Sequence, residues 1–420
     1  MGADVAAVAA LVLVVAAGAA TRLNVPLLAA TLSVIVGAWS GLGASGLILA
    51  APWLLCARLV AITALFTMAL TNGTLDRLAW LALRPVRARP GLVGPVFFAS
   101  ALALASSGAG NFAATAMLAP VAMVAARRFG VGAFLMSVMV VYGATAGAFS
   151  PVAPTGLVAR TLMLRAGIAH SAWALFLSAL AAHALVALTV YVLARGWKSG
   201  AGNAGGTTGA GGDEETVHGW TSVHRRTAGA LALFLLLVLA VRLPVEQAAA
   251  AATVALLVAA APRGAGWIRA MPWSLIGTVA GVSLLANVVE QAGGMTLLGR
   301  LLASAAEPMW LPGSVALVAG FVSVTASSIG VVLPAFLPAV PDIVRAAGGG
   351  DAVAIAYSVN VGAHLVDISP LSPLGAICLA YTLPGAGRQM LFSRLIWMGL
   401  AMCVLGAILC QALFGFSRVF

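Results

Sequence analysis

Long apolar runs separated by short polar connections extend along the whole chain, and this pattern predicts membrane-spanning helices. We place the apolar segments at about 4–21, 25–49, 53–72, 91–126, 131–168, 171–194, 227–241, 246–261, 271–289, 306–341, 352–384 and 391–417. With 62% hydrophobic and 8% charged residues, the chain is too apolar for a soluble globule. We therefore expect an all-α polytopic membrane protein.

One polar stretch divides the chain into two halves. Residues 199–215 read SGAGNAGGTTGAGGDEE, and their glycine, small polar and acidic residues cannot bury a face. Such a composition is typical of a flexible linker. It separates a first half, 1–198, from a second half, 216–420, with six apolar segments in each.

The fourth segment of each half, at about 91–126 and 306–341, has small polar residues at its centre. The strings are SSGAGN at 106–111 and TASSIG at 325–330. In the first half, each arm beside the string has about 16 residues and a length of roughly 24 Å, shorter than a hydrocarbon core of ~30 Å. We expect re-entrant hairpins, with two short spans joined by a polar loop as the alternative.

The fifth segment of each half, at about 131–168 and 352–384, contains a proline and glycine motif. SPVAPTG occupies 150–156 and SPLSPLG occupies 369–375. Proline removes a backbone donor and disrupts a helix, and irregular backbone at membrane depth must be buried in protein or line a cavity. These motifs predict broken helices, although an exposed loop after a short span is the alternative. Their recurrence indicates an internal duplication.

Parity and charge predict the topology. If each hairpin contributes no net crossing, five spans remain in each half, so the second half is inverted relative to the first and both termini lie outside. With the linker in the cytoplasm, Arg58 lies within a span and fifteen of the 22 basic residues lie on the inner side. This agrees with the positive-inside rule. The basic residues on the outer side are Arg160, Arg165, Arg242, Arg300, Arg345 and Arg418.

The tips and breaks supply the candidate site. Hydroxyls, an amide and helix-end dipoles suit an anion, whereas freed carbonyls suit Na⁺. The substrate candidates are Ser106, Ser107, Asn111, Ser150, Pro151, Pro154, Thr155, Thr325, Ser327, Ser328, Ser369 and Pro373. The candidates for cation coupling are Asn111, Ser328, His364 and Asp367.

Ionisable residues inside spans are functional candidates because a membrane charge is costly. His364 and Asp367 are three residues apart and share a helix face, so they suit a cation, a proton or a substrate carboxylate, with a structural cap as the alternative for Asp367. We interpret Arg58 as a buried partner or snorkelling residue rather than a substrate ligand. Glu290 and His183 receive no role, and the four cysteines are interpreted as packing residues.

The stretch GNFAATAMLAPVAMVAARRFGVGAFLMSVMVVYGATAGAFSPVAPTGLVARTLM, at 110–163, resembles dicarboxylate carriers of the MatC type. These are malonate-carrier relatives in the divalent anion/sodium symporter branch of the ion transporter superfamily. The resemblance implies a homodimer, elevator-type alternating access, and a site built from two hairpin tips and two unwound helices. It also implies import of malonate or a C4-dicarboxylate. Both tips depart from the Ser-Asn-Thr pattern of the best-understood symporters. In the first tip three small residues separate Ser107 from Asn111, and the second tip has no Asn.

Other function classes fit the sequence less well. A cation/proton antiporter or an arsenite-type oxyanion pump shares the fold, but a cation pump would favour carboxylates at the tips. A membrane-embedded enzyme would need clustered acids, a metal set or a nucleophile with its base. We expect no enzyme activity, no nucleic-acid partner and no cofactor apart from Na⁺ or H⁺ as coupling ion, with Na⁺ favoured. The 21 Arg to one Lys and the abundant Ala indicate a GC-rich bacterial gene. For a multi-pass bacterial protein of this kind we expect the inner membrane.

Overall fold

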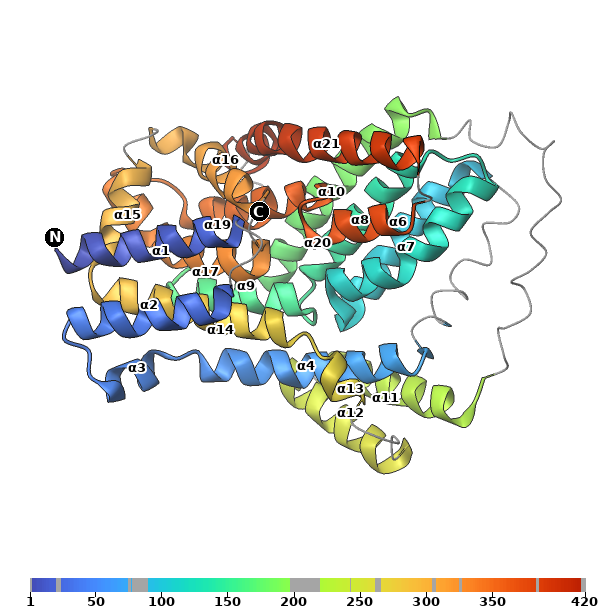
Figure 1. Cartoon of the computed structure of the whole chain (residues 1–420), viewed down its shortest axis with the longest axis horizontal. Helices are drawn as coiled ribbons and strands as arrows, with labels where there is room; N and C mark the ends of the chain where they lie inside the picture. The colour runs from blue at the N-terminus through green and yellow to red at the C-terminus, as the bar shows by residue number, and fades with distance from the viewer. Residues whose placement is uncertain are drawn as a thin grey trace.

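The computed structural model describes residues 2–19, 24–74, 77, 90–196, 220–241, 243–260, 266–303, 307–324, 327–382 and 385–416, and every regular element within them is a helix (Figure 1). This confirms an all-α polytopic membrane protein. The linker predicted at 199–215 lies outside the described residues. Six described stretches are long and apolar enough to cross a membrane: Trp53–Thr71, Val93–Arg127, Ala172–Leu193, Ser328–Ala346, Ala352–Ala380 and Ala386–Gly415.

The two halves contain helices in a similar order. The helices of the first half are α1 (Ala3–Ala19), α2 (Val25–Trp39), α3 (Ala44–Ala50), α4 (Trp53–Thr71), α6 (Val93–Leu104), α7 (Gly110–Arg128), α8 (Ala133–Ala148), α9 (Pro154–Arg165) and α10 (Ala172–Leu193). Those of the second half are α11 (Ser222–Leu239), α12 (Val245–Ala260), α13 (Gly266–Ala270), α14 (Trp273–Gln291), α15 (Gly294–Ala303), α16 (Leu311–Ser323), α17 (Leu333–Phe336), α18 (Val340–Ala346), α19 (Ala352–Leu365), α20 (Pro373–Ala380) and α21 (Ala386–Cys410).

Two predicted segments are subdivided in the structure. The segment expected at 25–49 forms α2 and α3, and the chain between them passes through Gly41 with φ +77°. A left-handed residue ends a helix, and glycine adopts that conformation without strain. The second arm of the later hairpin is α17, a 3₁₀ turn at Leu337–Ala339 and α18, because prolines recur along it and interrupt the helical hydrogen bonds.

The first predicted hairpin reverses direction at the predicted string. Ala105–Ala109 joins α6 to α7 with Gly108 at φ +115°, and both helices pack against each other and against α8. Helix α6 has 12 residues and is therefore about 18 Å long, shorter than a ~30 Å hydrocarbon core. These lengths support the re-entrant interpretation, which stays a prediction.

The second predicted hairpin has a first arm of similar length. Helix α16 has 13 residues and packs against α19, and the π-helical turn Ser328–Val332 follows it. Ser327 caps that turn, because its hydroxyl accepts a hydrogen bond from the Gly330 amide at 3.1 Å. The tip therefore begins where the polar string predicts it.

Both predicted breaks are present and have the same local geometry. A Cβ at Gly156 would lie 2.3 Å from the Ser150 carbonyl oxygen, and a Cβ at Gly375 would lie 2.3 Å from the Ser369 carbonyl oxygen. Only glycine permits that approach of the chain to itself. Ser150 is 4% exposed and Ser369 is 1% exposed, so both breaks start inside the protein, whereas Leu371 in the second break is 52% exposed.

A further correspondence joins the two halves. Helices α4 and α14 each have 19 residues and begin 220 positions apart, both directly after a proline. The Trp53 indole donates to the Ile48 carbonyl at 2.8 Å, and the Trp273 indole donates to the Ile268 carbonyl at 2.7 Å. These matched contacts support the internal duplication inferred from the breaks.

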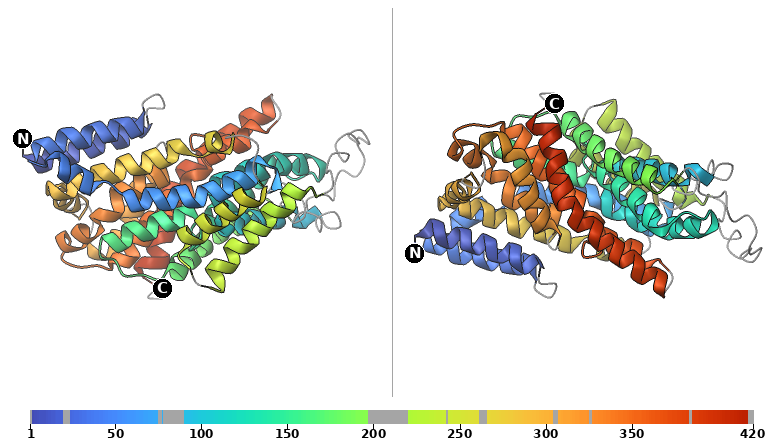
Figure 2. Two further views of the ribbon diagram at one scale, coloured as in Figure 1. Left: turned by 90° about the horizontal axis from the view of Figure 1, so that it is seen from below. Right: turned by 90° about the horizontal axis from the view of Figure 1, so that it is seen from above.

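The helices form one bundle with most long axes roughly aligned (Figure 2). Helices α1 and α2 lie side by side at one edge, while the long α21 crosses α16 and α19 obliquely. Many apolar side chains on the outer helices are exposed, among them Leu49, Val258 and Trp397. Such a surface suits lipid contact.

The close approach of α6 to α8 yields a stability prediction. A Cβ at Gly147 would lie 2.4 Å from the Leu102 carbonyl oxygen, so Gly147→Ala should lower the free energy of unfolding by about 1 to 3 kcal/mol. Gly229 lies in α11 with open space around it, so Gly229→Ala should be neutral or stabilise by up to ~1 kcal/mol. Thermal unfolding in detergent measures both. Equal stability of Gly147→Ala and the wild type would contradict the packing.

Candidate functional site

The tips and breaks of both halves lie around one cavity of about 480 Å³. Residues of both tips, both broken helices, α4 and α14 line it. Of the residues predicted from the sequence, those lining the cavity are Asn111, Pro154, Thr155, Ser327, Ser328, His364, Asp367 and Pro373. The substrate and coupling assignments of these residues stay predictions.

The other predicted residues that the structure describes are not part of the cavity lining. The Ser150 hydroxyl donates to the Ser106 carbonyl at 2.7 Å, which fastens the first tip to the first break. The Ser107 hydroxyl donates to the Leu104 carbonyl at 2.8 Å within the hairpin. Ser369 accepts from the Leu371 amide at 3.3 Å, Pro151 is partly buried in the first break, and Thr325 lies outside the described residues.

Asp367 is held by serines of the second half. The Ser328 hydroxyl donates to Asp367 Oδ1 at 2.6 Å, and the Ser372 hydroxyl reaches the same oxygen at 3.4 Å. Ser328 Oγ also lies 3.2 Å from the Ala363 carbonyl and 2.5 Å from Ser323 Oγ. A hydroxyl carries one proton, so the short contact to Asp367 is its main donated bond. These contacts place a carboxylate and several hydroxyl oxygens beside the second tip.

His364 lies on the neighbouring turn and is completely buried. Its Nδ1 lies 2.8 Å from the Asn360 carbonyl oxygen, and the Phe149 ring meets its ring edge to face at 4.8 Å between centroids. Its Nε2 has no hydrogen-bond partner among the described residues. The hydroxyl of Thr155, which is 1% exposed, also lacks a partner there. The two broken helices thus each contribute an unpaired polar atom.

Helix ends supply the positive potential of the cavity. None of the described residues lining it is Lys or Arg, and Asp367 is its one acidic residue. Helices α7, α9 and α20 begin at the cavity, and their first residues, Gly110, Pro154 and Pro373, line it. The first turn of a helix has amides without intrahelical partners and a partial positive charge, which bind carboxylates and phosphates. Pro154 and Pro373 have no N–H, so the amides available in α9 and α20 are those of the residues that follow, and in α7 the Phe112 amide already donates to Asn111 Oδ1.

Polar residues on two ordinary spans complete the cavity, and the sequence reasoning missed them. Thr63 and Thr67 lie on the second half of α4, whereas Ser274 and Thr278 lie at the start of α14. The cavity is thus lined by the C-terminal half of α4 and by the N-terminal end of its counterpart α14. This is expected if the second half is inverted. Hydroxyls one turn apart in an apolar helix were the available signal.

Comparison with known families adds to this geometry. Residues 1–148 match the model described as the N-terminus of the dicarboxylate carrier protein MatC. The chain thus has a MatC-type N-terminal region. The match confirms the resemblance seen in the sequence and supports a multi-pass carrier of dicarboxylates rather than an enzyme. No curated protein matches the chain.

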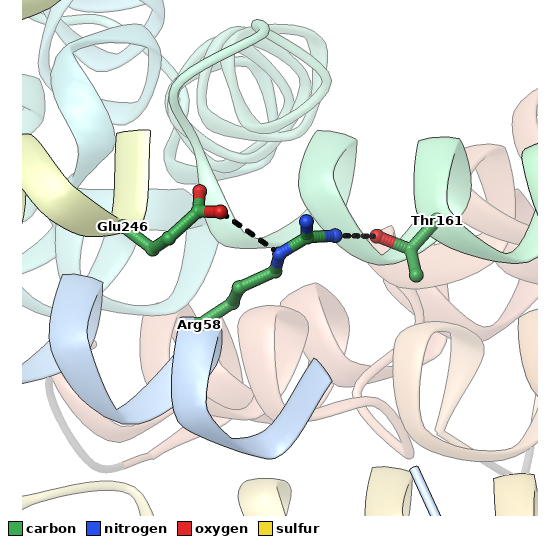
Figure 3. Close-up of polar contacts among 3 residues, drawn as sticks. All are labelled: Arg58, Thr161 and Glu246. Atoms are coloured by element: carbon green, nitrogen blue, oxygen red, sulfur yellow. Dashed lines mark hydrogen bonds and ion pairs between the residues drawn. The ribbon is translucent and has the colours of Figure 1, made fainter. Parts of the chain in front are cut away.

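Arg58 forms an ion pair away from the cavity lining (Figure 3). Its Nε donates to Glu246 Oε1 at 3.1 Å, and a terminal nitrogen of the guanidinium donates to Thr161 Oγ1 at 3.4 Å. The two charged side chains are 25% and 22% exposed. The contact joins α4 and α12 to α9, so Arg58 is a structural partner, as the sequence predicted.

This ion pair yields a prediction for stability. Arg58→Met leaves Glu246 without its partner in a partly buried position. The free energy of unfolding should therefore fall by about 1 to 3 kcal/mol, which lies between the costs of breaking an exposed and a buried ion pair. Glu246→Gln combined with Arg58→Met should cost less than the sum of the single changes. A double-mutant cycle by thermal unfolding in detergent measures this coupling. Additive effects would show that the pair contributes nothing.

Proposed function

We propose that the protein is a secondary active transporter that imports a small dicarboxylate, malonate or a C4-dicarboxylate, by cation-coupled alternating access. The observation that carries the proposal is the convergence of helix N-termini from both halves on one cavity without basic side chains. Backbone amides at such ends bind carboxylates without trapping them through a buried ion pair. The MatC match supports the same substrate class.

Electrostatics supports coupling to a cation. A dianion that enters against an inside-negative potential costs ~2.3 kcal/mol per charge per 100 mV, and Asp367 adds a negative group to the cavity wall. A co-transported cation offsets both effects. We propose Na⁺, with Asp367 and the Ser328 hydroxyl as oxygen ligands, because hard cations prefer such oxygens. We place His364 with the substrate.

An elevator movement belongs to the same proposal. The cavity lies between the ordinary spans α4 and α14 on one side and the tips and broken helices on the other. We propose that the tips and broken helices move as a unit against these spans in a homodimer in the bacterial inner membrane. The hydrogen bond from Arg58 to Thr161 joins α4 to α9 and would break during that movement.

The position of Asp367 also favours a second candidate. A buried carboxylate bonded to a tip serine suits a cation or proton pathway, as in a cation/proton antiporter of the same superfamily. An oxyanion pump remains a further alternative. The helix N-termini weigh against transport of cations alone, because their dipoles repel cations.

Uptake into proteoliposomes tests the proposal. Radiolabelled malonate, succinate, malate, citrate and arsenite should be compared in Na⁺ and choline buffers at fixed pH. We expect Na⁺-dependent uptake of malonate or a C4-dicarboxylate. Asp367→Asn should weaken the apparent Na⁺ affinity roughly tenfold or more, because a charged ligand becomes neutral. Asp342→Asn, a change to an acid paired with Arg345 outside the cavity lining, is the control and should behave as the wild type.

The other outcomes separate the alternatives. Transport of arsenite alone would identify an oxyanion pump. Dicarboxylate uptake that is unchanged in choline, responds to a pH gradient and disappears in Asp367→Asn would replace Na⁺ by H⁺ as the coupling ion. A cation flux without dicarboxylate transport would support the antiporter.

A further inference from the structure

The hydrogen bond of His364 fixes the proton on its ring. Nδ1 lies 2.8 Å from the carbonyl oxygen of Asn360, and a carbonyl oxygen only accepts hydrogen bonds. Nδ1 must therefore carry a hydrogen. A neutral imidazole has a single N–H, so Nε2 presents a lone pair and acts as an acceptor.

None of the described neighbours of His364 forms a hydrogen bond or ion pair that would stabilise a charged ring. Asp367 is one turn away, and its Oδ1 accepts from Ser328 and Ser372. Phe149, directly after α8, packs on the ring, and the Tyr142 hydroxyl on α8 donates to the Leu365 carbonyl. On α10, the neighbouring His183 bonds its Nδ1 to its own helix. No carboxylate is hydrogen-bonded to the His364 ring in the described structure, and a buried charge without a partner is costly.

An unpaired acceptor on a residue of the cavity wall would select the protonation state of a substrate that contacts it. His364 lines the cavity, is completely buried and has no partner for Nε2 among the described residues. A carboxylate oxygen has only lone pairs and would be repelled by Nε2, whereas the O–H of a carboxylic acid would donate to it. An ionised Asp367 and the lack of Lys or Arg in the described lining would also disfavour a dianion.

We infer that the cavity binds the dicarboxylate in its monoprotonated form, with the carboxyl proton hydrogen-bonded to His364 Nε2. The ionised carboxylate then faces the helix N-termini, and the unpaired Thr155 hydroxyl is available to donate to a carboxyl oxygen. The proton stays on the substrate throughout. This inference rests on the proposed function and names the transported species. With one Na⁺, such a species would cross without net charge.

Competition by two monoanions tests the inference in the wild-type protein. Malonamate and monomethyl malonate each carry one carboxylate, but the amide of malonamate offers N–H donors and the ester offers none. In proteoliposomes taking up radiolabelled malonate, malonamate should compete about tenfold better than monomethyl malonate. Inhibition by malonamate should not change with pH, whereas malonate uptake should rise as pH falls through the dissociation of its second carboxyl.

Two histidine variants make the test specific. His364→Gln offers an amide N–H that can donate to a carboxylate, so its malonate uptake should lose most of its pH dependence. His183→Gln is the matched control, because His183 is also completely buried with Nδ1 on a helix carbonyl and Nε2 unpaired in the described structure, but it does not line the cavity. It should keep the wild-type pH profile.

The contrary results are distinct. Equal competition by the two monoanions, or malonate uptake that follows the dianion as pH rises, would overturn the inference while leaving dicarboxylate transport intact. A pH profile lost equally in both histidine variants would also overturn it. Absence of uptake for every dicarboxylate would refute the proposed function itself. The competition experiment uses the wild-type protein, so it tests the inference even if His364→Gln fails to fold.

Discussion

The structure depends on one constraint: a helix that breaks inside the membrane must find partners for its freed backbone groups within the protein. The chain meets this constraint across elements. The Tyr142 phenol on α8 donates to the Leu365 carbonyl at the end of α19 at 3.0 Å, which joins the two halves directly. The Ser150 hydroxyl donates to the Ser106 carbonyl and fastens the first tip to the first break. The same breaks that require these partners leave helix N-termini free to face a cavity.

The electrostatics of the cavity follow from that arrangement. A buried arginine would bind a carboxylate strongly, but a carrier must also release its substrate. Helix N-termini distribute a partial positive charge over several amides, and neutral hydroxyls of Thr155 and Ser327 surround them. Asp367 opposes anion binding unless a cation accompanies it. In the proposed mechanism, binding of the anion and binding of the cation would therefore be coupled through the electrostatic field of the site.

Much of the fold was predictable because prolines and polar strings disrupt an apolar pattern in recognisable ways. The strings at 106–111 and 325–330 and the motifs at 150–156 and 369–375 located both tips and both breaks. The MatC match covers 1–148, so it includes the first tip but neither of the breaks and not the second tip. The Pro-Trp pairs at the starts of α4 and α14 were also visible in the sequence, and they would have strengthened the inference of an internal duplication.

Individual roles were harder to predict because they depend on contacts between distant segments. Ser106 and Ser150 were expected to bind substrate; in the described structure the Ser150 hydroxyl donates to the Ser106 backbone carbonyl, and the Ser106 hydroxyl has no partner. Thr63 and Thr278 lie on ordinary spans, where a hydroxyl normally bonds to its own helix, as both do. Glu246 is 188 residues from Arg58, and no local pattern identifies that partner.

The central claim is that residues of both halves form one substrate cavity. Substrate protection tests it most directly, with single cysteines at Ala113 and Ile329, which line the cavity from opposite halves, and at the exposed Glu307 as control. The background carries Ala in place of Cys56, Cys378, Cys403 and Cys410. Our account predicts that malonate with Na⁺ slows maleimide labelling of Ala113→Cys and Ile329→Cys equally and leaves Glu307→Cys unchanged. Protection in one half alone, or in neither, would contradict it.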